Sequence, residues 1–535
     1  MDPAGIGKCS PDHDSRCNTA VIDNLGSYKY KDILHSSYLL AQKIKKYIPD
    51  SNERISFLCS NDATYVSVLL ACWITGNTAV PLCTKHPESL LEYYVTDSQS
   101  KLLISNETFL DPIKNIASKS NLPSFVVNHD ILSIPSLTNE HKLLDSEFFS
   151  WKSNYEDRKA LIIYTSGTTG PPKGVVLNHG TLHSQVTAVI KMWEISATDA
   201  ILHSLPLHHI HGIMNALLCP LKIGGTVVMQ QKFDAVEAWK HFLAMDSKPR
   251  VNLFFAVPTM YAKLVQEFEK VGKNENDARE QCLKSMRLMC SGSASLPVPV
   301  FYRMEEITGH RLVERFGMSE IGMALSTSLN GPREAGTVGI PLPDVQVKIR
   351  KINDGSSNQV TDLIVGNHHE VKVLSENENS GELLVKGPNV FKEYWNKEKA
   401  TRETFTDDGW FLTGDTACFE KGAFKILGRT SVDIIKSGGY KISALEVESC
   451  LLRHPDIIEC TVFGVPDDVW GERVAAVLMY KKGKEISNSE LKAWCKQYIA
   501  PYAVPTIIKN VNEIPRNVMG KVNKKELKLK YKSLN

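Results

Sequence analysis

Apolar positions in the first hundred residues alternate between two spacings. In some segments they recur every three or four positions, which predicts amphipathic helices, and in others they form short continuous runs, which predicts buried strands. Helices are predicted at 30–47, 63–73 and 87–98, and strands at 54–59, 78–82 and 101–105. This alternation predicts an α/β architecture with a largely parallel sheet. Residues 106–158 are polar and irregular, and we expect surface connections there.

The same pattern continues and then changes in the last third of the chain. A helix is predicted at 180–192, and from Gly336 onward the pattern becomes β-rich. The polar segment 353–379 is expected to be a surface loop. The further strands are predicted at 160–163, 200–205, 224–229, 252–256, 287–291, 345–349, 382–386 and 424–427.

A domain boundary is predicted near residues 427–431, where the charge balance changes. Residues 429–535 hold 18 Lys and Arg against 12 Asp and Glu, whereas residues 1–428 hold 44 against 48. A small basic domain beside a slightly acidic body suits a polyanionic cofactor. A solvated lysine-rich tail explains the last dozen residues equally well.

Composition limits the class of protein. A chain of 535 residues exceeds what one hydrophobic core usually serves, so two or more domains are expected. The hydrophobic share of 42% and the charged share of 23% are typical of a globular protein. A net charge of +2 argues against nucleic-acid binding and against a polybasic membrane anchor. The most apolar stretch, 66–75, is too short to cross a bilayer.

Cysteine usage and the N-terminus bear on the compartment. The twelve cysteines are scattered without a Cys-x-x-Cys pair, which predicts reduced thiols in a reducing compartment. Residues 1–18 contain three aspartates and no apolar block, so neither a transit peptide nor a signal peptide is indicated. The sequence alone therefore predicts a cytoplasmic protein.

The segment from Tyr164 to Gly174 is the strongest candidate for a binding loop. It follows a predicted strand, and the segment after it is expected to open a helix. Its glycines let the backbone approach a ligand, and its backbone N–H groups, hydroxyls and Lys173 suit an anion. The spacing differs from a Walker loop because Lys173 precedes Gly174. A Gly-rich surface loop is the alternative, and the hydroxyls, the lysine and the preceding strand favour phosphate binding.

Two later segments also carry chemistry. Residues 207–212 hold three histidines in four positions, and pocket lining is favoured over a metal site because no Cys or carboxylate lies nearby at ligand spacing. Ser319 and Glu320 do not form a serine-hydrolase elbow, because Ile321 stands where glycine is needed. They suit a phosphate–magnesium group instead, since Mg²⁺ is usually held by one or two carboxylates plus substrate phosphates.

Taken together, these segments resemble the adenylate-forming superfamily of acyl-CoA synthetases, luciferases and peptide-synthetase adenylation domains. The matching segments run in the family's order over roughly residues 20 to 525. The resemblance implies a large N-terminal domain with a β-barrel-like part and a small mobile α+β C-terminal domain that turns about a hinge near Ser431. It implies the cofactors ATP, Mg²⁺ and coenzyme A. The matches are 164–174, 207–212, 315–320, 410–415, 428–441 and 515–521.

The family's roles transfer to individual positions of this chain. Ser319 corresponds to a phosphate ligand, Glu320 to the magnesium ligand and His209 to the residue that gates carboxylate access. Lys521 corresponds to the lysine that bridges the carboxylate and the α-phosphate. Ser431 departs from the Asp or Lys of many relatives, which leaves the charge contacts of the hinge open. The remaining cofactor positions are the phosphate loop with Thr165, Ser166, Gly167, Thr168, Thr169, Gly170 and Lys173, the ribose ligands Asp415 and Arg429, and the thiol-tunnel glycines Gly438 and Gly439.

The acyl pocket indicates one branch of the superfamily. Arg315 occupies the pocket wall, where many fatty-acid and aryl relatives have glycine, and an unpaired Arg in an apolar pocket is costly. A second carboxylate on the substrate is its natural partner, and an internal salt bridge to Glu314 or Glu320 is the alternative. The surrounding segments are similar to malonyl-CoA synthetases, including the acyl-CoA synthetase family member 3 type, which implies Arg315, His209 and Ser291 as substrate ligands.

The expected reaction is therefore ATP-dependent ligation of malonate to coenzyme A through an acyl-adenylate, with methylmalonate as a second diacid. A synthetase for short or medium monocarboxylates and an adenylation enzyme that loads a carrier protein are the alternatives. The mitochondrial matrix is the compartment that the resemblance implies, in place of the cytoplasm. Oligomeric state is left open.

Overall fold

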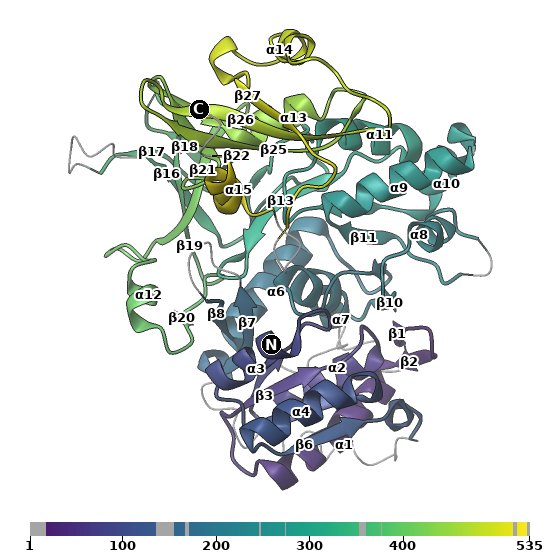
Figure 1. Cartoon of the computed structure of the whole chain (residues 1–535). Coiled ribbons are helices and arrows are strands. Elements are labelled where there is room, and N and C mark those ends of the chain that lie inside the picture. The colour runs from purple at the N-terminus through teal and green to yellow at the C-terminus, as the bar shows by residue number, and fades with distance from the viewer. Residues whose placement is uncertain are drawn as a thin grey trace.

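The computed structural model describes residues 18–134, 155–165, 171–245, 248–272, 274–351, 360–375, 377–516 and 522–531. Within these residues the strands form four sheets. Two are mostly parallel and are covered by helices, one is antiparallel, and the fourth belongs to the C-terminal part of the chain at the top of Figure 1. The predicted α/β class is confirmed.

The first parallel-rich sheet has seven strands in the order β20-β8-β7-β4-β3-β5-β6. Strands β4, β3, β5 and β6 are mutually parallel, β7 runs parallel to β4, and β8 and β20 are antiparallel additions at one edge. The strands span Arg54–Leu58 (β3), Thr78–Pro81 (β4), Leu102–Asn106 (β5), Ser124–Val127 (β6), Lys159–Thr165 (β7), Lys173–Asn178 (β8) and Glu393–Tyr394 (β20).

The second sheet has nine strands in the order β15-β14-β13-β12-β11-β9-β10-β1-β2. Its six central strands, β13 to β1 in this order, are parallel. The strands span Thr19–Ile22 (β1), Ser27–Lys29 (β2), Ala200–His203 (β9), Thr226–Met229 (β10), Leu253–Ala256 (β11), Leu288–Ser291 (β12), Val313–Met318 (β13), Gly322–Ser326 (β14) and Ile340–Pro341 (β15).

Helices pack on both of these sheets, and α2 shows why they form. All twelve residues of α2 are buried, which fits a helix that is apolar on every side. Asp62 caps it, because its carboxylate accepts hydrogen bonds from the backbone N–H groups of Thr64 and Tyr65. The helices are α1 (Tyr30–Tyr47), α2 (Ala63–Ile74), α3 (Glu88–Asp97), α4 (Leu110–Ser120), α6 (His179–Trp193), α7 (Cys219–Ile223), α8 (Ala235–Phe242), α9 (Pro258–Val271), α10 (Glu275–Ser285), α11 (Val298–Thr308) and α12 (Glu398–Arg402).

Short helical turns join some of these elements. They are the 3-10 turns η3 (Glu107–Phe109), η4 (His129–Ser133) and η6 (Tyr155–Asp157), and the π-helix η7 (His211–Leu218).

The antiparallel sheet has the order β18-β17-β16-β19-β21-β22 and lies where the family resemblance implies a barrel-like part. Its two end strands are not paired with each other among the described residues, so it is an open sheet there. Its strands span Gln346–Arg350 (β16), Asp362–Asn367 (β17), Val371–Val373 (β18), Ser380–Lys386 (β19), Phe411–Glu420 (β21) and Ala423–Arg429 (β22).

The C-terminal part has its own sheet and its own cores. Two buried hydrophobic clusters contain only residues from Ile435 onward, whereas the other two contain no residue beyond Ile426. The elements are β23 (Ile434–Ser437), β24 (Tyr440–Ser443), α13 (Ala444–Leu451), β25 (Ile457–Asp467), β26 (Gly471–Tyr480), α14 (Asn488–Cys495), η8 (Pro501–Ala503), β27 (Ile507–Asn510) and α15 (Lys524–Lys530).

Two segments predicted as irregular are partly regular. Helix α4 and strand β6 lie within 106–158, because Ile113, Ile116 and Ala117 form a buried helical face in an otherwise polar sequence. Strands β17 and β18 lie within 353–379, where Leu363 and Ile364 are buried. Both segments are mostly polar, so a small number of buried residues stabilises the helix and the strands within them.

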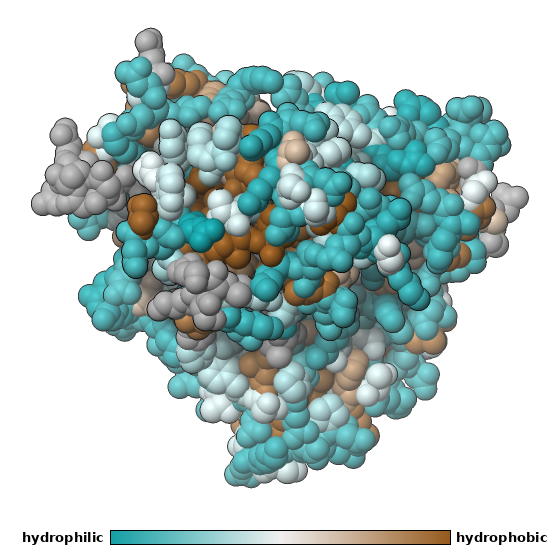
Figure 2. Space-filling view, turned by 45° about the horizontal axis from the view of Figure 1, so that its top comes forward, coloured by the Kyte–Doolittle hydropathy of each residue, from teal (hydrophilic) through white to brown (hydrophobic). Residues whose placement is uncertain are grey.

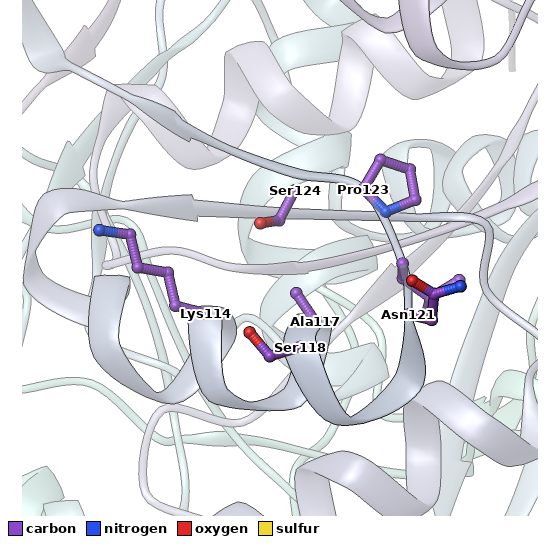
Figure 3. A pocket seen from close by; sticks show the side chains of 7 residues that line it. Lys114, Ala117, Ser118, Asn121, Pro123 and Ser124 are labelled. Carbon is purple, nitrogen blue, oxygen red and sulfur yellow. The ribbon is translucent and has the colours of Figure 1, made fainter.

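The remaining features of the fold lie at the surface of the molecule. Figure 2 shows hydrophobic side chains in patches among hydrophilic ones, and Val469 and Trp470 are 85% and 57% exposed. A pocket of about 350 Å³ lies at the turn between α4 and β6, and no predicted site residue lines it (Figure 3). Among the described residues, no helix is long and apolar enough to cross a membrane.

Candidate active site

The predicted phosphate loop joins two strands. Thr165 ends β7 and Lys173 begins β8, and the two residues are antiparallel partners. The expected helix directly after the loop is therefore wrong: the buried, β-branched run at Val175 and Val176 forms a strand first, and α6 follows it. Ser166, Gly167, Thr168, Thr169 and Gly170 lie outside the described residues.

Glu320 lies at the turn between β13 and β14 and is 6% exposed. The hydroxyl of Tyr394 donates a hydrogen bond of 2.8 Å to Glu320 Oε1, and Lys173 Nζ lies 4.9 Å from the centre of the Tyr394 ring. Burial raises the pKa of Glu320, while the Tyr394 hydrogen bond and the charges of Arg429 and Lys173 lower it. Ser319 is half-buried beside it.

Asp415 and Arg429 face each other across β21 and β22. Arg429 Nε lies 3.3 Å from Asp415 Oδ1, and Arg429 Nη1 donates to the carbonyl oxygen of Thr413 at 2.6 Å. Burial raises the pKa of Asp415 to about 6. Asp415 Oδ2 is buried and has no hydrogen-bond partner among the described residues, so it is available to a ligand hydroxyl.

These groups form one charged cluster that fits a magnesium–nucleotide complex. The charge of Glu320 raises the pKa of Asp415, and the charge of Arg429 lowers that of Glu320. A buried carboxylate suited to the cation, the positive side chain of Lys173 for a phosphate, and the Asp415–Arg429 pair with an unsatisfied carboxylate oxygen for a ribose hydroxyl are all present. Sequence reasoning missed Tyr394, whose role depends on β20 pairing with β8.

Arg315 lies on β13, five residues before Glu320, and is 6% exposed. Its Nη2 donates to Ser293 Oγ at 3.1 Å, and its Nε is buried without a hydrogen-bond partner. Burial lowers its pKa to about 10. Among the described residues no carboxylate lies within 4.0 Å of its guanidinium nitrogens, so neither Glu314 nor Glu320 forms the internal salt bridge.

The residues around Arg315 leave space for its side chain. A Cβ on Gly292 would lie only 2.2 Å from Arg315 Nε, so only glycine admits the guanidinium at this place. Glu314 is turned away, as alternate residues of a strand are, and accepts a hydrogen bond from the backbone N–H of Gly336. Burial raises the pKa of Glu314 to about 8.

Other polar groups lie near Arg315, of which Ser293 was not predicted and Ser291 was predicted as a substrate ligand. Ser293 Oγ, which accepts from Arg315, lies 3.3 Å from Nδ1 of His211. Burial lowers the pKa of His211 well below its usual value, and the charges of Arg315 and His209 lower it further. Ser291 ends β12, and its buried hydroxyl has no partner among the described residues. The sequence itself could have indicated His211, since it belongs to the same histidine segment as His209.

His209 lies in the loop between β9 and the π-helix η7, half-buried. Its ring packs against that of His208 at a centroid distance of 4.1 Å. The π-helix begins at His211, and such helices often occur at functional sites. The structure therefore brings His211, Ser293 and Arg315 together, and His209 lies two positions before His211 in the chain.

The remaining predicted residues lie in the C-terminal part. Gly438 and Gly439 have φ angles of +56° and +84° and form the two-residue turn between β23 and β24, which favours Gly-Gly. Their hairpin is exposed, and its described contacts include Trp470 but none of the other predicted site residues. Lys521 lies outside the described residues, between the paired positions Arg516 and Val522.

Comparison with known proteins defines the class. A family described as AMP-binding enzyme matches residues 14–395, and one described as AMP-binding enzyme C-terminal domain matches residues 446–521. The chain belongs to the AMP-binding enzyme family of adenylate-forming enzymes.

Three known proteins are similar to this chain over most of its length. The mitochondrial malonate–CoA ligase ACSF3 of Xenopus laevis is 47% identical over 521 residues, covering 95% of this chain and 89% of the relative. The crystal structure of ATP-bound MatB from Rhodopseudomonas palustris has a TM-score of 0.84 and 28% identity, with full coverage of both chains. A malonyl-CoA ligase in a ternary product complex with methylmalonyl-CoA and AMP has a TM-score of 0.64 and 30% identity, covering 96% of this chain and all of the other.

Proposed function

We propose that this chain is an acid–thiol ligase that joins malonate to coenzyme A. ATP activates the acid as an acyl-adenylate with release of pyrophosphate, and the thiol of coenzyme A then displaces AMP. Methylmalonate is the second substrate in this proposal. We propose a diacid because Arg315 is buried and has no carboxylate partner among the described residues.

Arg315 recognises the carboxylate that does not react. A buried guanidinium is stable only when an anion pairs with it, and here Ser293 supplies a neutral hydroxyl. Its free Nε and the fork geometry of arginine suit bidentate binding of a carboxylate. His211 and Ser291 lie beside it as neutral hydrogen-bonding groups. Malonate has one carboxylate for this position and a second for activation.

The cluster around Glu320 serves the first half-reaction. Both reactants are anions, so the site must neutralise charge and align the acid with the α-phosphorus. Mg²⁺ supplies charge neutralisation when bound, and Glu320, held by Tyr394, is its ligand. Ser319, Thr165, the 166–170 loop and Lys173 bind the phosphates. Asp415 and Arg429 hold the ribose, and Lys521 bridges the carboxylate and the α-phosphate.

The second half-reaction requires the C-terminal part to turn. We place the domains at 1–428 and 429–535 with the hinge near Ser431, which is supported by separate hydrophobic cores up to Ile426 and from Ile435. In this structure the hairpin of Gly438 and Gly439 is exposed. The similarity to the ATP-bound neighbour exceeds that to the product complex, which supports an arrangement suited to adenylation.

The compartment is part of the proposal. The names of four vertebrate relatives include the word mitochondrial, which supports the matrix rather than the cytoplasm. Protease protection of the full-length protein in purified organelles tests this. Digestion of the protein while a matrix marker survives contradicts it.

Thioester formation with ATP, Mg²⁺ and coenzyme A tests the function. The acids to compare are malonate, methylmalonate, acetate, butyrate and octanoate. We expect strong preference for the two diacids. Preference for a monoacid contradicts the role of Arg315 and leaves an acyl-CoA synthetase of another specificity, whereas AMP formation without thioester contradicts ligation to coenzyme A.

A further inference from the structure

A cysteine and two histidines come together next to the acyl pocket. Cys83 and His86 lie in the loop after β4, and His208 lies in the loop after β9. Their ligand atoms, one thiol sulfur and two imidazole nitrogens, all lie within 4.8 Å of one another. The sequence hides this group, because more than a hundred residues separate the Cys-Thr-Lys-His segment from the histidine segment.

The fold holds both loops in place. The hydroxyl of Tyr65 donates to the carbonyl oxygen of Leu207 at 2.6 Å, which ties the histidine loop to α2. The amide of Asn61 donates to Leu205 at 2.8 Å from the same side. In the other loop, the backbone N–H of His86 donates to the carbonyl of Cys83 at 3.2 Å, which closes a turn that directs both side chains together.

We propose that Cys83, His86 and His208 form a binding site for Zn²⁺, and that the bound ion inhibits the ligase. A thiolate and two imidazoles are typical ligands of zinc, whereas Mg²⁺ prefers oxygen. Zinc–ligand bonds of about 2.0–2.3 Å require the three atoms to approach by about 1 Å, which loop side chains allow. Three protein ligands leave the fourth position for water.

The proposed inhibition depends on His209, which is next to His208. The rings of His208 and His209 pack at a centroid distance of 4.1 Å, so an ion bound to His208 restrains the side chain that gates the acid. This step rests on the proposed function, but binding of the ion does not. Metal binding and inhibition can therefore be tested separately.

The binding test uses the full chain after chelator treatment and removal of the chelator. Equilibrium dialysis against Zn²⁺ is expected to give one ion per chain, and Co²⁺ is expected to show the charge-transfer absorption of a thiolate ligand. Replacement of one ligand, as in Cys83→Ala or His208→Ala, should weaken Zn²⁺ binding by about tenfold or more. Cys59→Ala, which replaces another buried cysteine at the end of a neighbouring strand, is the matched control and should bind as the wild type. Unchanged Zn²⁺ affinity in both ligand variants overturns the site, as does Co²⁺ binding without a thiolate band.

The inhibition test measures thioester formation at saturating Mg²⁺ with increasing Zn²⁺. Wild type and Cys59→Ala should lose activity over the Zn²⁺ range in which the site fills, and Cys83→Ala should lose it only at about tenfold higher Zn²⁺ or more. Equal inhibition of all three proteins means that Zn²⁺ acts elsewhere and overturns the inhibitory role. If the chain makes no thioester from any acid, the proposed function fails, while the dialysis result still decides the metal site.

Discussion

At the scale of single residues, the site depends on polar groups whose hydrogen-bonding capacity the protein leaves unused. Arg315 Nε, Ser291 Oγ and Asp415 Oδ2 are buried and lack partners among the described residues. Buried polar groups are normally satisfied, so each such exception needs an explanation. The proposed function assigns a bound carboxylate to the first two and a ribose hydroxyl to the third.

The first prediction concerns Arg315→Met, which keeps an unbranched, flexible side chain and removes the charge and the hydrogen-bond donors. We expect kcat/KM for malonate to fall by about 100-fold or more, since truncation of one partner of a buried charge pair costs about 2–5 kcal/mol. The KM for ATP should change little. Steady-state kinetics with malonate and ATP varied in turn measure both.

The matched control is Arg333→Met. Arg333 is half-buried, and among the described residues its hydrogen bonds go to backbone carbonyls of Arg311, Ser328 and Leu329. Its replacement should cost stability without changing the choice of acid. A similar loss of malonate activity in both variants, or none in Arg315→Met, means that Arg315 does not recognise the substrate.

The second prediction concerns Asp415 and pH. Burial raises its folded-state pKa to about 6, above the usual value for aspartate. A raised carboxyl pKa contributes stability at low pH that is lost as pH rises through the folded pKa, so the ionised group costs the fold about 1–3 kcal/mol at pH 8. Asp415→Asn should therefore raise the Tm at pH 8 and leave it nearly unchanged at pH 4. It should also raise the KM for ATP.

Thermal unfolding of wild type and Asp415→Asn across this pH range tests the stability part. Asp362→Asn is the control, because Asp362 is a half-exposed acid paired with Lys348 on the same antiparallel sheet. A lower Tm for Asp415→Asn at pH 8 would falsify the stated cost of ionisation. An unchanged KM for ATP contradicts the ribose contact.

At the scale of elements, the sequence predicts segments whose pattern is strong along their whole length. The helix predicted at 30–47 and the strand predicted at 54–59 appear at nearly the same bounds, because their apolar spacing is regular. Helix α4 and strand β17 were missed, because only a few buried residues fix them within polar segments. Most candidate site residues were predicted from motif resemblance and stay predictions, whereas Tyr394 and Ser293 depend on pairing between distant strands and loops, which no local pattern reports.

The third prediction concerns helix α15 and its anchor, Lys524. Its ammonium lies 2.6 Å from Asp433 Oδ1 and 2.8 Å from Glu448 Oε1, with side-chain exposures of 12%, 12% and 17%. Asp433 Oδ2 in turn accepts from the backbone N–H of Arg429. The anchor thus links the segment that follows Lys521 to the hinge. We predict that Lys524→Met slows adenylation by about tenfold or more while thioester formation from preformed acyl-adenylate is retained.

Lys528→Met is the matched control for the same helix. Lys528 pairs with Glu472 at 3.2 Å nearer the surface, so its loss should cost little. Breaking the buried group at Lys524 should also lower stability by about 3–5 kcal/mol, so both rates must be measured well below the Tm of the variant. Lys524→Arg should restore most of the adenylation rate. Equal loss of both half-reactions in Lys524→Met indicates a purely structural role.

At the scale of the whole molecule, the proposed function assigns two groups of the C-terminal part, the Gly438–Gly439 hairpin and Lys521, to different half-reactions. The Gly438–Gly439 hairpin joins β23 to β24, whereas Lys521, which lies outside the described residues, precedes α15 in the sequence. Arg429 belongs to the antiparallel sheet, and Ile434 begins the C-terminal sheet only five positions later. A rotation about this short connection is the simplest way to exchange the two groups, and such motions can limit turnover.

The last prediction follows from that exchange, and it pairs two variants with opposite defects. Lys521→Ala should abolish malonate-dependent pyrophosphate exchange and still convert preformed malonyl-adenylate to thioester, because the lysine serves only the first step. Gly439→Val should show the reverse: its φ of +84° disfavours a branched side chain, but the hairpin makes no described contact with the adenylation cluster. Gly483→Val, at a φ of +75° in another exposed turn of the same domain, controls for general strain. If Lys521→Ala loses both half-reactions, or Gly439→Val loses pyrophosphate exchange while Gly483→Val keeps it, the two groups act in one arrangement and the rotation is unnecessary.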